Sequence, residues 1–367
     1  MPTFRPGTEL AERLYREAVA PLLGRAFDGL NHSAARVGAG SDVLGHDTPR
    51  STDHDWGPRL TLFLPDDRAD LAAEVDAVLG DGLPATVAGW PTGFAASDTT
   101  ALGVLGGPGV TRHGVTVTTV SDWLTGLLGH DRPARPDGPT VADWTAMPQQ
   151  RLLEITGGVV CHDGLGTLVP VRRRLAWYPD PLWRHLMAAQ WTKLGQEEHL
   201  VGRAAEVGDE LGAALLAARQ ARELLRLALW QVRRYAPYGK WLGTAVARQV
   251  PDAAAITGRL RTAVAAVDAA DREAGLCRAY RELARRHNAL GLTAELDPRC
   301  RPFHDRPFAV LDAERFAAAL RDTVTDPMMA GLPRWGMVDQ WADSTDLLTS
   351  AAALDAPARE LGEAIPG

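Results

Sequence analysis

The chain lacks several features that would define its chemistry directly. It has only three cysteines, Cys161, Cys277 and Cys300, and none of them forms the C-x-x-C spacing of zinc or redox motifs. Its ten histidines are scattered, so no zinc cluster is predicted. No apolar run approaches about 18 residues, and the first ten residues contain no apolar segment. We therefore expect a cytoplasmic protein with no membrane span, no secretory signal and no disulfide framework.

An excess of positive charge is also absent. The 367 residues carry a formal net charge of −7, and the densest basic patch is Arg172-Arg173-Arg174. Proteins that bind nucleic acid usually have a basic surface that neutralises the phosphates of the backbone. The charge balance therefore argues against a general nucleic-acid binder, and it favours a small and cationic partner over a polynucleotide.

Hydrophobic periodicity separates a mixed part of the chain from a helical part. Apolar runs predict strands at 59–64 and 115–120, and helical spacing predicts a helix at 10–27 that Pro21 kinks or splits. A hairpin with an Asp163-Gly164 turn is predicted over 157–175. After residue 181 helical patterns dominate, among them one continuous helix over 206–235.

These elements predict an α+β protein with two domains. We expect a first domain at 1–155 with a small mixed sheet, a hairpin or linker at 156–180, and an all-α bundle at 181–367. A chain of this length can bury a core in each domain. A cleft between two such domains is a common place for a substrate.

The most informative row of residues contains Gly40-Ser41 and, after eleven further residues, Asp53-His54-Asp55. A Gly-Ser turn allows close backbone approach and exposes N–H groups to a phosphate. Two carboxylates at i and i+2 on a strand point to one face and can share divalent cations such as Mg²⁺. The alternative is a polar surface turn followed by an acidic strand start. The apolar strand that follows favours the functional interpretation.

The wider sequence resembles a known family. The row Gly-Ala-Gly-Ser-Asp-Val-Leu-Gly-His-Asp, followed by Ser-Thr-Asp-His-Asp-Trp-Gly-Pro-Arg-Leu, is similar to the DUF4037 proteins. So are Gly-Gln-Glu-Glu-His, Gly-Arg-Ala-Ala-Glu-Val-Gly-Asp-Glu-Leu-Gly and Arg-Arg-Tyr-Ala-Pro-Tyr-Gly-Lys-Trp-Leu-Gly. The resemblance extends from Leu10 to Asp346. It implies the nucleotidyltransferase fold shared by DNA polymerase β and the antibiotic nucleotidyltransferases.

The resemblance implies roles for the first row of residues. The Gly40 turn and the Ser41 hydroxyl would hold the triphosphate at the start of a helix, and Asp53 and Asp55 would bind Mg²⁺. Nucleotidyltransferases usually add a third carboxylate from a later strand. The corresponding strand here offers Thr116 and Thr118, with Asp122 just beyond it.

A second group of charged residues lies in the helical part. At three- and four-residue steps, Arg203, Glu206, Asp209 and Glu210 would share one face of a helix. By resemblance to antibiotic nucleotidyltransferases, Glu206 or Asp209 would be the general base for an acceptor hydroxyl. Arg203 would offset triphosphate charge. The alternative is a salt-bridged solvent face.

Two further cations have both a functional and a structural interpretation. Lys240 follows Pro237 and Gly239, which would end a helix and place its ammonium in a turn where it could meet phosphate. Arg222 interrupts an apolar stripe that includes Leu211 and Leu215, so it needs a carboxylate or phosphate partner. A structural ion pair with a neighbouring helix is the interpretation we favour for Arg222.

Together these features predict a nucleotidyltransferase. It would move a nucleoside monophosphate from a Mg²⁺-bound nucleoside triphosphate (NTP) to a hydroxyl of a small acceptor and release pyrophosphate. Two alternatives stay open. One is a nucleotide-binding regulator that keeps the fold with weak or no turnover, and the other is a nucleotidyltransferase that modifies protein or RNA.

Overall fold

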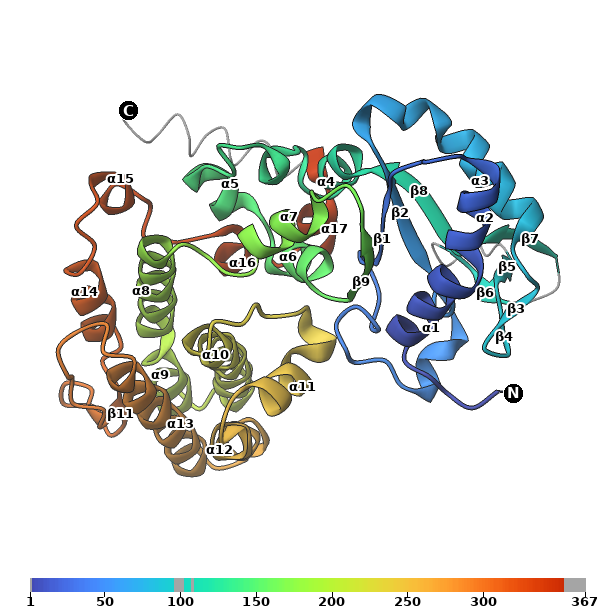
Figure 1. The fold of residues 1–367 in the computed structure, drawn as a ribbon. Helices are drawn as coiled ribbons and strands as arrows, with labels where there is room; N and C mark the ends of the chain where they lie inside the picture. The colour runs from blue at the N-terminus through green and yellow to red at the C-terminus, as the bar shows by residue number, and fades with distance from the viewer. Residues whose placement is uncertain (1, 96–101, 107–108, 353–367) are drawn as a thin grey trace. The chain divides into compact units, whose positions relative to one another are not determined.

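The computed structural model describes residues 2–95, 102–106 and 109–352, and these fall into two compact units (Figure 1). Unit 1 comprises the described residues up to 140 together with 151–176 and 349–352. Unit 2 comprises 141–150 and 177–348. The last fifteen residues of the helical domain predicted at 181–367 lie outside the described residues.

Unit 1 is built on a four-stranded mixed sheet. Its strand order is β8-β2-β1-β9, from β1 (Ser33–Arg36), β2 (Leu60–Leu64), β8 (Val115–Thr119) and β9 (Val159–Asp163). β1 pairs antiparallel with β2 and with β9, whereas β2 and β8 run parallel. All five residues of β2 are buried, which explains its continuous apolar sequence Leu-Thr-Leu-Phe-Leu.

Helices cover the sheet and close the core of unit 1. Leu60, Leu62 and Leu64 of β2 pack in one apolar cluster with side chains of α1 (Gly7–Leu14) and α3 (Ala72–Gly82). The helix predicted at 10–27 is divided, as expected: a π-helical turn at Tyr15–Val19 joins α1 to α2 (Ala20–Ala26), and Pro21 lies in the first turn of α2. The N–H of Ala20, the residue before Pro21, donates to the carbonyl of Tyr15 in the π-helical pattern, and Pro21 itself has no N–H to donate.

Short elements complete unit 1. A three-stranded sheet has the order β6-β5-β7, and β3 pairs with β4. The bounds of these elements are β3 (Thr86–Val87), β4 (Trp90–Pro91), β5 (Gly93–Ala95), β6 (Val104–Leu105), β7 (Val110–His113), α4 (Val120–Leu128), and 3₁₀ turns at Pro49–Asp53, Asp66–Leu71 and Arg132–Ala134.

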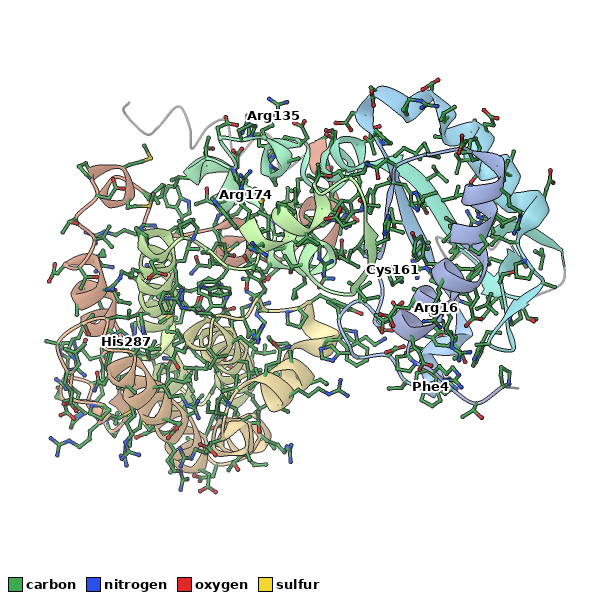
Figure 2. The ribbon with its side chains drawn as sticks, viewed as in Figure 1. Phe4, Arg16, Arg135, Cys161, Arg174 and His287 are labelled. Carbon is green, nitrogen blue, oxygen red and sulfur yellow. The ribbon has the colours of Figure 1, made fainter. Side chains whose placement is uncertain are left out.

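The hairpin predicted over 157–175 is not formed. The segment begins with the edge strand β9, which pairs with β1, and continues as α7 (Leu168–Arg174). The basic patch in α7 has structural partners. Arg172 donates to the carbonyls of Ile155, Thr156 and Gly157 at the end of α6 (Gln149–Thr156). Arg174 donates to the carbonyls of Pro133 and Arg135 (Figure 2).

Unit 2 is helical. Its helices are α5 (Val141–Ala146), α8 (Asp180–Glu197), α9 (Leu200–Glu206), α10 (Glu210–Gln231), α11 (Gly239–Gln249), α12 (Ala253–Ala265), α13 (Ala269–Ala289), α14 (Glu314–Arg321), α15 (Pro327–Ala330), α16 (Val338–Trp341) and α17 (Thr345–Thr349), with a small β10 (Arg301–Pro302) and β11 (Ala309–Val310) ladder. The last residue of α17 is assigned to unit 1.

The core of unit 2 is rich in tryptophan. Trp183, Trp191 and Trp230 are fully buried. His287 of α13 (Figure 2) contacts one of them: Trp191 Nε1 donates to its Nδ1 at 3.2 Å, and Phe316 packs edge-on against its ring. Burial lowers the pKa of His287 to about 4, so it is a neutral core residue at neutral pH.

The predicted α+β class is confirmed, with a mixed sheet in the N-terminal part and a helical C-terminal part. Among the residues that the structure describes, no helix is long and apolar enough to cross a membrane.

Candidate functional site

The Gly-Ser turn follows β1 and depends on glycine. Gly38 has a φ of +83° and Gly40 a φ of +154°. A Cβ on Gly40 would lie 2.2 Å from Asp42 Oδ1 and 2.3 Å from Arg36 Nη2. A side chain at this position is therefore excluded by both the backbone conformation and the space.

A buried ion pair holds the turn. Arg36 Nε and Nη2 donate to the two carboxylate oxygens of Asp42 at 2.6 and 2.8 Å, and the two side chains are only 3% and 1% exposed. The same guanidinium donates to the carbonyls of Val37 and Ala39. Such a bidentate pair in a dry site keeps the backbone between its two partners in one conformation.

The helix expected after Gly40-Ser41 is absent. Residues 41–45 form hydrogen-bonded turns instead, with the N–H of His46 donating to the carbonyl of Ser41 at 2.8 Å. Gly38 and Gly40, together with the ion pair between Arg36 and Asp42, favour this compact loop over a helix. Within the described residues, the Ser41 hydroxyl has no hydrogen-bond partner and is partly exposed.

The two aspartates are not on a strand, in contrast to the prediction. Asp53 ends a 3₁₀ turn that begins with a Thr48–Ser51 capping box, and Asp55 has a φ of +47°. The strand β2 starts only at Leu60, after Gly57 and Pro58. Local capping and proline therefore outweigh the alternation that predicted a strand face.

Asp53 and Asp55 have different surroundings. The Asp53 side chain is 52% exposed, and among the described residues it contacts His54, at 3.0 Å from the His54 Nδ1. Asp55 Oδ1 accepts the N–H groups of Leu102 and Gly103 at 2.7 and 3.0 Å. Asp55 therefore anchors a distant loop, whereas Asp53 is open to solvent.

Arg59 brings the two motifs together. Its Nη2 donates to the Ala39 carbonyl at 3.2 Å, and its Nη1 donates to the Asp55 carbonyl. Burial, with the nearby Arg36 cation, lowers the pKa of Arg59 to about 10, so it stays protonated at neutral pH. One guanidinium thus connects the Gly-Ser turn to the aspartate segment.

Among the described residues, no group of three His, Cys, Asp or Glu side chains is arranged to hold a metal ion. Thr116 and Thr118 lie on β8 opposite Thr61 and Phe63 of β2. Asp122 lies in the first turn of α4, where its N–H is bonded to the Thr119 side chain. No third carboxylate therefore joins Asp53 and Asp55 in the described part of the chain.

The second charged group does not share one helix face. The helix predicted at 206–235 is interrupted, because α9 ends at Glu206 and Gly208 adopts a φ of +77°. The Asp209 carboxylate then caps α10 by accepting the N–H of Gly212 at 2.8 Å. An aspartate after a glycine is a typical helix start. The Gly208-Asp209 pair therefore indicated a new helix, but the prediction followed the three- and four-residue spacing of the charged residues instead.

The other members of this group lie around the same break. Glu206 pairs with Arg306 at 2.8 Å, and Glu210 pairs with Arg272 at 3.2 Å. Arg203 on α9 is exposed. The prediction that Pro237 and Gly239 end a helix and leave Lys240 in a turn is wrong, because α10 already ends at Gln231 and Gly239 begins α11. Lys240 lies in the first turn of α11, 4.9 Å from the Trp241 ring centroid. These placements leave the roles proposed for Glu206, Asp209, Arg203 and Lys240 as predictions.

Glu198, between α8 and α9, is the acidic residue of this region with the largest pKa shift. Burial raises its pKa to about 7, with a smaller contribution from Asp312, although it accepts the N–H groups of Leu311 and Ala313. A raised carboxyl pKa favours folding below the ordinary value of 4.5, and this stabilisation is lost as the pH rises to about 7.

We expect the parent chain to lose up to about 3 kcal/mol of stability from this group between about pH 4.5 and pH 7. The measurement is urea denaturation at several pH values for the parent and for Glu198→Gln. Because glutamine does not ionise, the variant should show the smaller decrease. Equal pH slopes for the two proteins would contradict the assignment.

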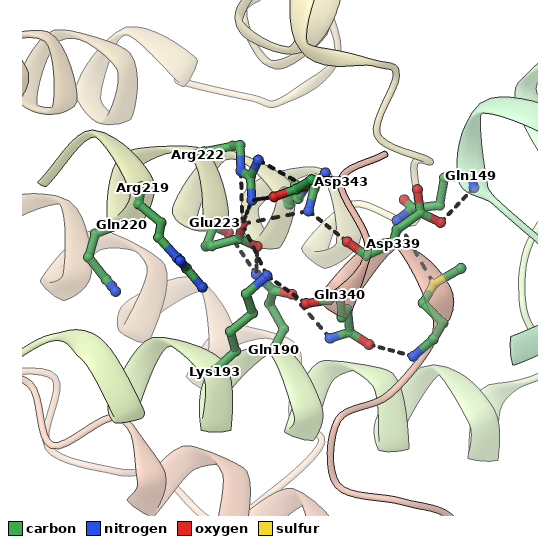
Figure 3. Close-up of polar contacts among 12 residues, drawn as sticks. Gln149, Gln190, Lys193, Arg219, Gln220, Arg222, Glu223, Asp339, Gln340 and Asp343 are labelled. Carbon is green, nitrogen blue, oxygen red and sulfur yellow. Dashed lines mark hydrogen bonds and ion pairs between the residues drawn. The ribbon is translucent and has the colours of Figure 1, made fainter. Parts of the chain in front are cut away.

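Unit 2 also contains a polar network that the sequence did not predict (Figure 3). Its centre is Glu223 of α10, whose side chain is fully buried. Lys193 and Arg226 approach one carboxylate oxygen at 3.3 and 3.6 Å, and Gln190 donates to the other at 2.9 Å. The nearby cations lower the pKa of Glu223 in spite of its burial.

The partner predicted for Arg222 is found at the edge of this network. Its two terminal nitrogens donate to the two carboxylate oxygens of Asp343, at 3.0 and 3.1 Å (Figure 3). Arg222 therefore forms the expected structural ion pair, but Asp343 lies in the segment between α16 and α17 and not on a neighbouring helix as predicted. The predicted stripe is not the buried face of α10, because Leu211 and Leu215 are exposed.

The residues that support the site were given no role in the sequence analysis. They are Asp42 and Arg59, which belong to the quoted motif, and Arg36, which lies two residues before it. An arginine at the last position of a strand, with an aspartate directly after a Gly-Ser turn, is the signal that could have identified Arg36 and Asp42. No comparable local signal identifies Arg59, because its contact with the Ala39 carbonyl forms only when folding brings the two segments together.

Taken together, the fold and the site define an α+β protein with a rigid glycine turn beside a pair of aspartates. Residues 144–242 match the family model described as a domain of unknown function (DUF4037). The DUF4037 resemblance is confirmed for this segment, which does not include Gly40, Ser41, Asp53 or Asp55. No curated protein matches the chain.

One solved structure is similar to this chain, the crystal structure of a nucleotidyltransferase-like protein from Exiguobacterium sibiricum 255-15. The match covers 84% of this chain and 89% of that one, with 11% sequence identity and a TM-score of 0.34.

Proposed function

We propose that the chain is a nucleotidyltransferase that moves a nucleoside monophosphate from a Mg²⁺-bound NTP to a hydroxyl of a small acceptor. The observation that carries this proposal is the double contact of Arg59 with the Ala39 and Asp55 carbonyls. It links the Gly-Ser turn to the segment that carries Asp53 and Asp55, and phosphoryl-group chemistry needs a phosphate-binding turn together with metal-binding carboxylates.

The donor set fits Mg²⁺. This ion prefers oxygen ligands and is usually held by one or two carboxylates together with substrate phosphates and water. Asp53 and Asp55 supply the carboxylates, so a third protein ligand is not required for binding. When bound, Mg²⁺ would neutralise triphosphate charge and lower the pKa of an attacking hydroxyl.

The other residues have proposed roles in this reaction. Ser41 and the Gly40 turn donate hydrogen bonds to phosphate oxygens, and Arg203 and Lys240 offset triphosphate charge. Glu206 or Asp209 accepts the proton of the acceptor hydroxyl. The net charge of −7 favours a small, cationic acceptor over a polynucleotide.

Mg²⁺-dependent NTP binding tests the proposal. We expect Asp53→Ala to weaken binding of at least one of ATP, CTP, GTP and UTP by about tenfold or more, because a charged ligand is lost. The Asp53 side chain is exposed and, in the part of the chain that the structure describes, contacts only His54, so the variant should fold. Calorimetric titration with and without Mg²⁺ gives the measurement.

Two further variants sharpen this test. Asp55→Asn removes the charge but keeps an oxygen for Leu102 and Gly103, so it should lose Mg²⁺-dependent binding without unfolding. Asp67→Ala removes an exposed carboxylate on another turn of unit 1 and should bind NTP like the parent. No Mg²⁺-dependent binding of any NTP by the parent would refute the proposal.

Turnover separates the proposed enzyme from the alternatives. Release of pyrophosphate in the presence of small amino sugars or other hydroxylated compounds supports transfer to a small acceptor. Release that occurs only with protein or RNA supports the second enzyme alternative. NTP binding without pyrophosphate release from any acceptor pool supports the nucleotide-binding regulator.

A further inference from the structure

Unit 2 contains a cavity of about 300 Å³ whose lining includes Glu206 but none of the proposed phosphate or metal ligands. Residues of α9, α13 and β11 form its walls. The volume is at the lower end of the range for small-molecule sites. It therefore suits a compact ligand of roughly ten non-hydrogen atoms.

The walls of the cavity are mostly apolar. Val201 of α9, Leu276 of α13, and Phe308 and Val310 of the β11 segment line it. A Cβ on Gly202 would lie 2.4 Å from the Phe308 ring, so Gly202 allows this ring to approach α9. Such walls favour a ligand with an apolar body.

Two carboxylates that lack a cationic partner lie in these apolar walls. Within the described residues, neither Glu198 nor Glu273 forms an ion pair. Glu273 Oε1 accepts the N–H of Ala309 at 3.1 Å, and no described residue bonds to its Oε2. Burial raises the pKa of both carboxyl groups. A cation placed between them would remove this electrostatic cost.

The other charged groups of the cavity have partners, although the buried Nε of Arg272 has no hydrogen-bond partner among the described residues. Glu206 is bonded to Arg306, and Arg272 is bonded to Glu210 and to the Ala266 carbonyl. Neither Arg306 nor Arg272 forms an ion pair with Glu198 or Glu273, so the negative charge of the cavity lining exceeds its positive charge. An anionic ligand would meet two uncompensated carboxylates, and a neutral one would leave them as they are.

We propose that this cavity is a binding site for a compact apolar ammonium ion, whose charged group lies between Glu273 and Glu198 and whose apolar body lies against Phe308, Leu276 and Val201. Binding requires no proton transfer or covalent step. The proposal does not depend on nucleotidyl transfer, since all the residues involved belong to unit 2 and none of them is a proposed phosphate or metal ligand.

Three probes of similar shape and different charge test the site by calorimetric titration of the full chain at neutral pH. They are benzylamine, benzyl alcohol and benzoate. We expect benzylamine to bind at one site, benzyl alcohol to bind about tenfold more weakly and benzoate not to bind, because only the ammonium carries the positive charge that forms an ion pair with the carboxylates.

Variants locate the binding. Glu273→Gln keeps an oxygen for the Ala309 N–H and removes the charge, so we expect it to weaken benzylamine binding about tenfold and leave benzyl alcohol unchanged. Glu282→Gln removes a carboxylate of the same helix that faces Arg286, and it should bind like the parent. Ala270→Phe places a ring at an exposed position of the cavity wall and should weaken both ligands.

Equal affinities for benzylamine and benzyl alcohol would overturn the proposal, as would failure of the folded parent to bind benzylamine. Unchanged benzylamine binding by a folded Glu273→Gln variant would also overturn it. These outcomes are independent of NTP binding, so the cavity and the proposed nucleotidyltransferase activity can fail separately.

Discussion

Replacing Arg36 with methionine is expected to lower the free energy of unfolding of unit 1 by about 3–5 kcal/mol. The variant leaves Asp42, which is 1% exposed, without its cation in a dry environment. It also removes the hydrogen bonds to the Val37 and Ala39 carbonyls that hold the Gly-Ser turn. Urea denaturation followed by circular dichroism measures the loss.

The double variant Arg36→Met/Asp42→Leu is the matched control. Because an uncompensated buried charge causes most of the expected loss, removing both charges should recover a large part of it. NTP binding should be weak in both the single and the double variant, since neither has the Arg36 guanidinium that donates to the Ala39 carbonyl. A single variant as stable as the parent would contradict the structural role of this pair.

The second large effect is expected for Glu223→Ala in unit 2. It removes the carboxylate that Lys193, Arg222 and Arg226 surround and leaves these cations close together. Breaking a buried ionic network on one side costs about 3–5 kcal/mol, because the remaining charges stay partly desolvated. The measurement is the urea midpoint and slope of the variant against the parent.

Asp343→Asn provides a comparison within the same network. Asp343 is 64% exposed, and its pair with Arg222 is accessible to solvent. Exposed pairs of this kind contribute about 0–1 kcal/mol, so the variant should resemble the parent. If Asp343→Asn destabilised unit 2 as much as Glu223→Ala, burial would not be the reason for the importance of Glu223.

Much of the architecture could be predicted from local patterns. The apolar run of β2 and the alternating threonines and valines of β8 lie within one residue of the ranges expected for them. Their residues prefer a pleated backbone, and turn residues bound β2 on both sides. Arg222 was identified as a structural ion-pair residue because a guanidinium in an apolar context needs a carboxylate.

Other predictions failed because equally local signals were given too little weight. The capping box at Thr48 and the Gly57-Pro58 pair keep Asp53 and Asp55 off the strand. Gly208 and the cap at Asp209 break the helix predicted at 206–235. In both cases the prediction relied on the spacing of charged residues, although the capping and turn-forming residues beside them decided the local backbone conformation.

The sequence by itself determined the α+β class, the positions of the buried strands and the residue types available for phosphate and metal binding. The tertiary structure alone decided how these residues are held. Asp55 bonds to Leu102 and Gly103, and Arg59 bonds to Ala39, across 47, 48 and 20 positions of the chain. Periodicity and capping act over a few residues, whereas such hydrogen bonds exist only once the sheet has brought distant loops together.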